Sequence, residues 1–333
     1  MRQLILTACT WVLCTFSSAA ETPDIDQIVD THVLPGYERL VSLAQDLTAA
    51  ANLDCSLDND TLRTAYHDAF DAWVSVSHLR FGPSEQSNRA FALAFWPDTR
   101  GVTPRTLSAM IAAEDNVLET PDVFATASVA ARGFYALEFL LYDPAFADQT
   151  TADYRCLLVQ AIALDIERNA AAILSDWRTG YADLMRQAGQ NETYRSDLEA
   201  AQQFFTSLST GLEFTSDMRL GRPMGTFDRP RPNRAEVRRS GRSLRHVVLS
   251  LRATRDLARL LSDGDATLDA AFARSLQLAN DLNDPVFAGV STPQGRFEVE
   301  ALKQSIDDIR ALVATQLGPK LGVAAGFNSL DGD

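Results

Sequence analysis

The stretch from Gly133 to Asp143 reads Gly-Phe-Tyr-Ala-Leu-Glu-Phe-Leu-Leu-Tyr-Asp. On a helix, residues three and four apart share a face. The apolar stripe consists of Phe134, Leu137 and Leu141. The adjoining stripe consists of Tyr135, Glu138 and Tyr142. A carboxylate between two phenols is unlike a solvated face, which leaves two interpretations of Glu138. It is a metal ligand or general base lined by hydroxyls, or a buried structural carboxylate satisfied by Tyr or Arg.

The composition around this helix predicts an all-α protein. The 333 residues include 47 Ala and 41 Leu, which favour helices, and only 17 Gly and 13 Pro. Long amphipathic segments joined by short loops are typical of antiparallel bundles. We predict two fused helical bundles: residues 21–188, which contain the Gly133–Asp143 helix, and residues 189–333, which contain an arginine-rich loop and helix.

Three helix boundaries follow from proline and capping signals. Helical periodicity covers residues 25–52, where Pro35-Gly36 should kink or divide the helix. Thr120-Pro121 is an N-cap followed by proline at the first helical position, and it predicts a helix running to about Tyr142. Asn233 is expected to cap a helix that runs to Leu261.

The first 20 residues have the features of a secretory signal peptide. Arg2 precedes the apolar run from Leu4 to Phe16, and small residues at 18–20 offer a cleavage point before Glu21. The alternative is lipid attachment at Cys9, preceded by Leu-Thr-Ala. No later segment contains 18 consecutive apolar residues, so we expect an exported, periplasmic protein whose mature chain has no transmembrane segment.

Cleavage at that point would leave two cysteines, Cys55 and Cys156. In an exported chain, two cysteines predict one disulfide, which here would close a loop of about 100 residues. The alternative is a pair of separate buried thiols. A metal site on these thiols is not expected, because neither has a His or Cys at ligand spacing.

Charge is distributed unevenly along the chain. The formal net charge of −14 argues against a nucleic-acid partner. Eight arginines nevertheless fall within residues 222–245. On a continuous helix, Arg238, Arg242 and Arg245 would share one face, continued by Arg252 and Arg259. Arginine suits carboxylate and phosphate groups, so the cluster either captures an anionic ligand near residues 222–234 or pairs with carboxylates of the protein itself.

The common catalytic motifs are missing from the sequence. It has no His-Glu-x-x-His, no Gly-x-Ser-x-Gly and no P-loop. His67 and Asp71 are four residues apart on a predicted helix and could share a ligand, whereas His78 is too far along that helix to join them. His32 and His246 have no partner that the sequence identifies.

The chain resembles the imelysin family over nearly all of its mature length. Supporting segments are Ala72-Trp73, Arg80–Pro83, Phe95–Asp98, Leu321–Val323 and Gly326–Asp333. In the family hallmark Gly-x-His-x-x-Glu, Gly133 and Glu138 match, while Tyr135 occupies the histidine position. The resemblance implies two fused helical bundles with a site near their junction, an association with iron uptake and a peptidase label.

These observations predict an exported imelysin-like binding protein of iron acquisition, without catalytic activity. Its ligand would be a small molecule or a metal such as iron, and an envelope iron-uptake protein is a candidate partner. The candidate ligand-binding residues are Tyr135, Glu138, Tyr142, Asp98, Arg222 and Arg242. Glu138 is also the candidate metal ligand. The alternatives are a metal-dependent hydrolase that uses Glu138, or an envelope adaptor that binds a protein through its arginines.

Overall fold

The computed structural model describes residues 22–323. The predicted signal peptide, the alternative lipidation site Cys9 and residues 324–333 of the family-like C-terminal segment lie outside the described residues. Within the described chain the fold is all-α, as predicted, and the only extended pairing is an isolated bridge between Thr226 and Arg229. No helix of residues 22–323 is long and apolar enough to cross a membrane.

The first group of helices comes from the N-terminal part of the chain. Its members are α1 (Ile25–Ile28), α2 (Leu34–Leu53), α3 (Asp60–Val76), α4 (Arg89–Leu93), α5 (Val102–Ala113), α6 (Pro121–Phe124), α7 (Gly133–Tyr142), α8 (Ala152–Asp176) and α9 (Ala182–Arg186). Helix α2 packs against α3 and α8, and α7 packs against α3 and α8. These four helices therefore enclose a common core, which includes the buried rings of Tyr66, Phe70 and Phe134.

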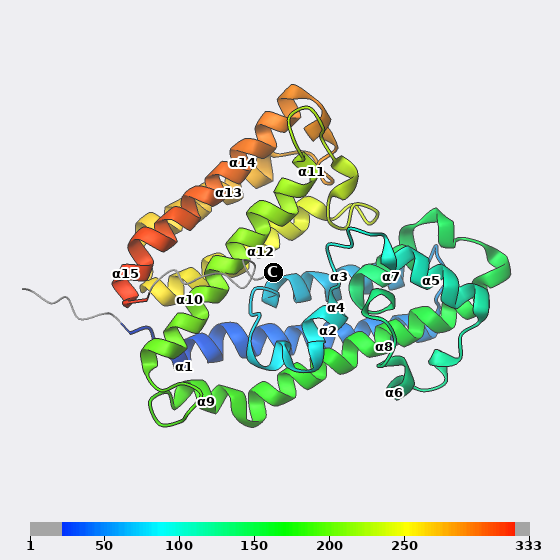
Figure 1. Ribbon diagram of the computed structural model, residues 1–333, viewed down its shortest axis with the longest axis horizontal. Coiled ribbons are helices and arrows are strands. Elements are labelled where there is room, and N and C mark those ends of the chain that lie inside the picture. Colours follow the sequence, from blue (N-terminus) through cyan, green and yellow to red (C-terminus); the bar gives the residue numbers. More distant parts are fainter. Residues whose placement is uncertain (1–21, 324–333) are drawn as a thin grey trace, which may run out of the picture.

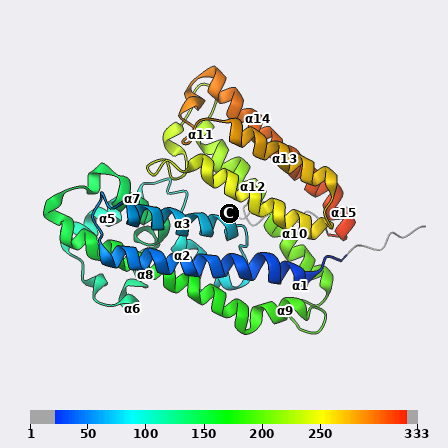
Figure 2. The same cartoon turned by 180° about the vertical axis from the view of Figure 1, so that it is seen from behind.

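The second group is a bundle of four long helices. The C-terminal helices are α10 (Asp197–Glu213), α11 (Arg222–Met224), α12 (Ser243–Ser262), α13 (Ala266–Asp281), α14 (Pro293–Leu312) and α15 (Gly318–Leu321). Helix α12 packs against α10 and α13, and α14 also packs against both. Figures 1 and 2 show this group crossing the first obliquely, and α12 contacts α3. The division after residue 188 falls between α9 and α10 and stays a prediction, because the groups share extensive contacts.

Wide π-helical turns accommodate three prolines without ending their helices. The turns are Val29–Val33, Phe214–Gly221 and Val313–Leu317, and Pro35, Pro223 and Pro319 follow two residues after them. In a regular helix a proline ring clashes with the carbonyl four residues earlier, and a locally wider turn relieves that clash. Of the two outcomes expected at Pro35-Gly36, a kink or a division, the division does not occur, because the chain stays helical from Ile25 to Leu53.

The extent of one predicted helix and the start of another are also corrected. The helix expected from Pro121 to Tyr142 is interrupted after Phe124, and α7 begins anew at Gly133. The helix expected from Asn233 begins instead at Ser243. Val237 and Gly241 adopt positive φ angles of 43° and 73°, which an α-helix does not contain. Arg238 and Arg242 consequently precede the helix and do not share a helix face with Arg245.

Candidate functional site

Residues 235–242, here called the junction segment, connect the two helical groups at the Gly133–Asp143 helix. The segment precedes α12 in the chain, yet its side chains bond to residues of α3 and α7. Leu244, just beyond it, donates its backbone N–H to Pro285 O over 3.0 Å. The junction segment is thus held by both groups and places its polar side chains on α7.

Glu138 is bonded by the junction segment rather than by a tyrosine or an arginine. Its Oε1 accepts the backbone N–H of Ser240 over 3.0 Å and the Ser240 hydroxyl over 2.9 Å. Burial raises the pKa of Glu138, against the opposing effect of these two hydrogen bonds and of the charge of Arg239. Within residues 22–323, Oε2 accepts no hydrogen bond, so one carboxylate oxygen is held and the other is available.

Tyr135 donates its hydroxyl to Glu236 of the junction segment. Its ring stacks on Trp96, with 6.1 Å between ring centroids, and meets Phe70 edge-on at 5.2 Å. The side chain is therefore fixed at both its apolar and its polar end. Tyr135 and Glu138 lie one helical turn apart, but they bond different residues of the junction segment, Glu236 and Ser240.

Glu236 is the centre of a buried polar cluster that the sequence did not reveal. Arg219 Nε donates to Glu236 Oε2 over 2.7 Å, and His246 Nδ1 lies 3.2 Å from the same oxygen. Arg219 also donates to the Ser250 hydroxyl over 2.8 Å. Burial alone would raise the pKa of Glu236, but the charges of Arg219 and His246 and the hydrogen bonds of His246 and Tyr135 lower it from 4.5 to about 2.

Tyr142 lies at the far end of α7 and has its own partner. Its hydroxyl lies 2.8 Å from His67 Nε2, and the two rings stack at 5.7 Å. Burial raises the pKa of Tyr142 to about 12, and burial followed by the charge of Arg242 lowers the pKa of His67 to about 4. The predicted stripe of Tyr135, Glu138 and Tyr142 therefore exists, but each member bonds a different residue elsewhere in the chain.

The other histidines also gain partners through the fold. His32 and His78 meet at 2.9 Å between their Nε2 atoms, although 46 residues separate them in the chain. Neither contributes to the cluster around Glu236. Of the four histidines, His246 is the one that the structure brings to the junction segment.

Two further candidate residues occupy the margin of the junction. Asp98 accepts the backbone N–H groups of Val102 and Thr103 over 2.9 and 2.7 Å, and thereby caps α5. Arg222 lies over the Trp96 ring, 5.4 Å from its centroid. Burial and the nearby charge of Arg234 lower the pKa of Arg222. Trp96, which Arg222 contacts, also stacks on Tyr135, so Arg222 lies near the motif helix. Both Asp98 oxygens already accept backbone N–H groups.

Several arginines near the junction pair with carboxylates of the first helical group. Arg242 Nη2 lies 2.5 Å from Asp71 Oδ1, and Arg245 Nε lies 3.0 Å from Asp71 Oδ2. Arg239 Nε donates to Asp143 over 2.6 Å. These pairs correspond to the alternative in which the arginines bond the protein's own carboxylates, and Arg242, a candidate ligand residue, is one of them.

The predicted disulfide is present. Cys55, after α2, is bonded to Cys156 in α8, and their Cα atoms lie 5.4 Å apart. The bond fastens together the ends of two helices that already pack against each other. It lies within the first helical group and leaves the junction segment free of covalent links among the described residues.

The residues around Glu138 do not fit a metal site. No group of three His, Cys, Asp or Glu side chains within residues 22–323 is arranged to hold a metal ion. Tyr135 bonds Glu236, and Glu236 is already neutralised by the Arg219 guanidinium. A permanently charged guanidinium beside the carboxylate opposes a second cation there. The donor set therefore suits a hydrogen-bonded ligand better than a bare metal ion.

The fold and the Gly-x-Tyr-x-x-Glu helix define an all-α protein with a polar junction between two helical groups. The model of the imelysin family matches residues 33–313, and the chain belongs to that family. Among curated proteins, none matches the chain.

Two solved structures share the fold. An imelysin-like protein from Psychrobacter arcticum 273-4 superposes with a TM-score of 0.76 at 21% identity, over 91% of this chain and 96% of that one. A protein from Parabacteroides distasonis ATCC 8503, named as an iron-regulated protein A precursor, superposes with a TM-score of 0.73 at 13% identity. That match covers 92% of this chain and 97% of the other.

Proposed function

We propose that this protein is an exported, non-catalytic binding protein of iron acquisition, whose ligand contacts Glu138 at the junction segment. The observation that carries the proposal is the state of the Glu138 carboxylate. One oxygen is held by two bonds from Ser240, and the other accepts none within the described residues. Glu138 is a buried residue, yet Oε2 is not among the fully enclosed side-chain atoms that lack a partner in residues 22–323, so a ligand that donates a hydrogen bond can reach it.

Family membership and the disulfide support the remaining parts of the proposal. The name of the Parabacteroides protein refers to iron regulation, which is the basis for placing this chain in iron acquisition. A disulfide persists in an oxidising compartment, in agreement with export to the periplasm. The Arg219–Glu236 pair beside Tyr135 favours a ligand with hydrogen-bond donors over a metal-dependent hydrolase.

Native mass spectrometry tests the ligand site. The chain, exported with its own leader, is purified after incubation with the low-mass fraction of an iron-limited culture. We expect the wild type to retain an added mass that Glu138→Gln loses. The exposed Glu119→Gln is the matched control and should retain it. Absence of any added mass from the wild type, or its retention by Glu138→Gln, would reject the proposed site.

Two further measurements address the metal-dependent alternative. Hydrolysis of casein with added Zn²⁺ or Fe²⁺ should not exceed the rate of a protein-free control. Tyr135→His, which restores the family motif, should not acquire stoichiometric zinc in dialysed protein, because Arg219 already neutralises Glu236. Turnover, or one zinc per chain in Tyr135→His, would favour the hydrolase instead.

A further inference from the structure

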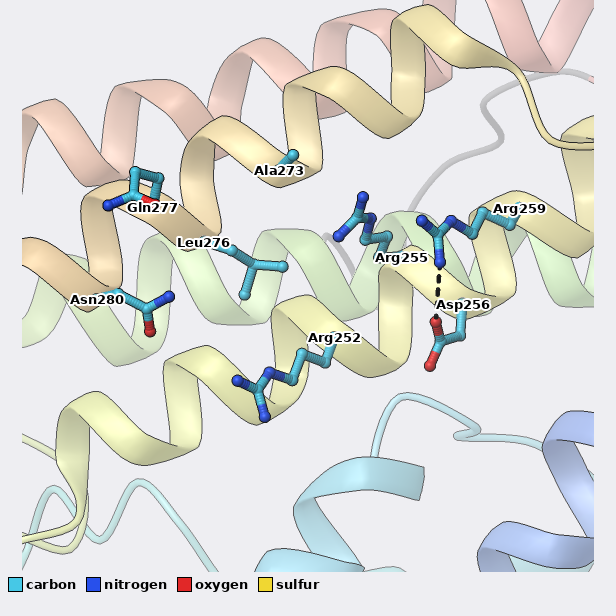
Figure 3. Close-up of a pocket in the computed structure, with 8 residues that line it drawn as sticks. All are labelled: Arg252, Arg255, Asp256, Arg259, Ala273, Leu276, Gln277 and Asn280. Carbon is cyan, nitrogen blue, oxygen red and sulfur yellow. Dashed lines mark ion pairs between the residues drawn. The ribbon is translucent and has the colours of Figure 1, made fainter.

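Helices α12 and α13 form the walls of a groove on the second helical group. Two adjoining hollows, each about 410 Å³, share Arg252 and Asn280. Figure 3 shows Arg252, Arg255 and Arg259 on one helix, and Gln277 and Asn280 on its neighbour. The second hollow continues the groove toward Gly241 and Arg245. Figure 2 shows α12 and α13 side by side along the near face of the second helical group.

The groove carries surplus positive charge because its arginines share carboxylates. Arg255 and Arg259 both donate to Asp269, over 2.7 and 2.5 Å. At the other end, Arg242 and Arg245 share Asp71. Arg252, between them, has no ion pair within residues 22–323 and is exposed. Two further carboxylates line the groove. Asp256 lies 3.9 Å from the Arg259 guanidinium, and Asp284, at the other end, accepts the backbone N–H groups of Ala288 and Gly289.

The arginines repeat at a regular interval along α12. Arg245, Arg252 and Arg259 are seven residues apart, or about 10.5 Å at 1.5 Å per residue. The positive row therefore spans about 21 Å. A polyproline II peptide rises about 3.1 Å per residue with three residues per turn, so every third side chain recurs on one face about 9.3 Å along. Acidic residues at that interval would match the arginine row.

The opposite wall and the floor also suit a peptide. Gln277, Asn280 and Asn283 line the other side, and side-chain amides can both donate to and accept from a peptide backbone. The floor includes the nearly buried side chains of Val248, Leu276 and Leu282. The protein has a formal net charge of −14, so a long polyanion would be repelled by the surface outside the groove. A short acidic segment confined to the groove avoids that repulsion.

We propose that the α12–α13 groove binds an extended acidic segment of a partner protein, about seven residues long, with a carboxylate at every third position. Arginine forks on one wall bind the carboxylates, while the amides of the other wall bind the backbone. Glu138 does not line the groove, although the Gly241 end adjoins Ser240, which bonds Glu138. The proposal does not rest on the ligand proposed at Glu138.

The test uses a fluorescein-labelled peptide of sequence Glu-Pro-Pro repeated three times, and fluorescence anisotropy with the mature protein. The reference peptide has Gln in place of each Glu. We expect saturable binding of the acidic peptide alone, weakened at least tenfold by Arg252→Gln. Because Arg252 has no ion pair among the described residues, this change should leave folding intact, as circular dichroism would confirm. Arg274→Gln, an exposed arginine outside the groove, is the matched control and should change Kd less than twofold.

Several outcomes would overturn the assignment. They are no binding of the acidic peptide, equal binding of the Gln peptide, or equal loss in Arg274→Gln and Arg252→Gln. Binding of polygalacturonate or single-stranded DNA that depends on Arg252, without peptide binding, would assign the groove to another polyanion. Glu138→Gln should leave the peptide Kd unchanged, so failure of this proposal and failure of the Glu138 site are distinguishable.

Discussion

At the scale of single residues, Tyr135 and Glu138 lie on one helix but have different bonding partners. Tyr135 adds a hydroxyl that reaches Glu236, and Glu236 in turn holds Arg219 in the buried interior. Glu138 is bonded by Ser240, and no cationic side chain of residues 22–323 donates a hydrogen bond to it. The two glutamates therefore differ in chemistry, because one is compensated by a guanidinium and the other is bonded only by neutral donors.

We predict that Glu236→Gln destabilises the protein by about 3–5 kcal/mol at pH 7, because it leaves Arg219 buried without its carboxylate. The pKa of Glu236 is about 2 in the folded protein and 4.5 as its ordinary value. A lowered carboxyl pKa stabilises the fold above the unfolded value. The wild type should therefore lose this contribution as the pH falls from about 4.5 to 2.

Urea unfolding at pH 7 and at pH 3 measures both effects. The difference in unfolding free energy between wild type and Glu236→Gln should narrow at pH 3. Glu119→Gln, at an exposed position, should stay within about 0.5 kcal/mol of the wild type. A Glu236→Gln loss under 1 kcal/mol at pH 7 would contradict the role assigned to the buried pair.

At the scale of elements, the start of α7 decides where the motif residues lie. Gly133 has φ +72°, and a Cβ there would lie 2.2 and 2.3 Å from the backbone oxygens of Ala92 and Leu93. Only glycine allows the two backbones to approach this closely. The close approach of α7 to α4 therefore depends on Gly133, which is also the first residue of the family motif.

We expect Gly133→Ala to cost about 3 kcal/mol or more, through both overlap with backbone and an unfavourable φ. Gly101→Ala is the matched comparison, because Gly101 has φ +63° but no atom within 4 Å of the added Cβ. That variant should lose only about 1–2 kcal/mol. Guanidinium unfolding measures the loss of unfolding free energy in both variants. Equal losses would show that overlap with α4 adds nothing to the cost of Gly133→Ala.

At the scale of the whole molecule, two kinds of long-range link hold the chain together. The disulfide joins α8 to the end of α2 within the first helical group. The junction segment joins the second group to the first through Asp71, Glu138 and Asp143. One link is covalent and sensitive to redox conditions, while the other is ionic and hydrogen-bonded.

The double variant Cys55→Ser/Cys156→Ser should lose up to about 4–5 kcal/mol of unfolding free energy, from the greater chain entropy of the unfolded state. Reducing agent should lower the Tm of the wild type and leave that of the double variant unchanged. The intact mass of the exported wild type should equal that of a chain that starts at Glu21, less the two hydrogens lost when the disulfide forms. Thiol labelling of both cysteines under native conditions would contradict the disulfide. A lipidated N-terminus at Cys9 would contradict cleavage before Glu21.

The sequence by itself determined the helical class, the disulfide and the polar stripe of α7, because each depends on composition, cysteine number or local periodicity. The helix start at Pro121 was right, but its expected run to Tyr142 and the start at Asn233 were wrong, because capping signals are local and packing at Gly133 and Val237 overrides them. Only the tertiary structure decided the partners: Tyr135 and Glu236 are 101 residues apart, and Glu138 and Ser240 are 102 apart. Helical periodicity relates residues three or four apart, so it carries no information about which distant side chain a buried carboxylate will meet.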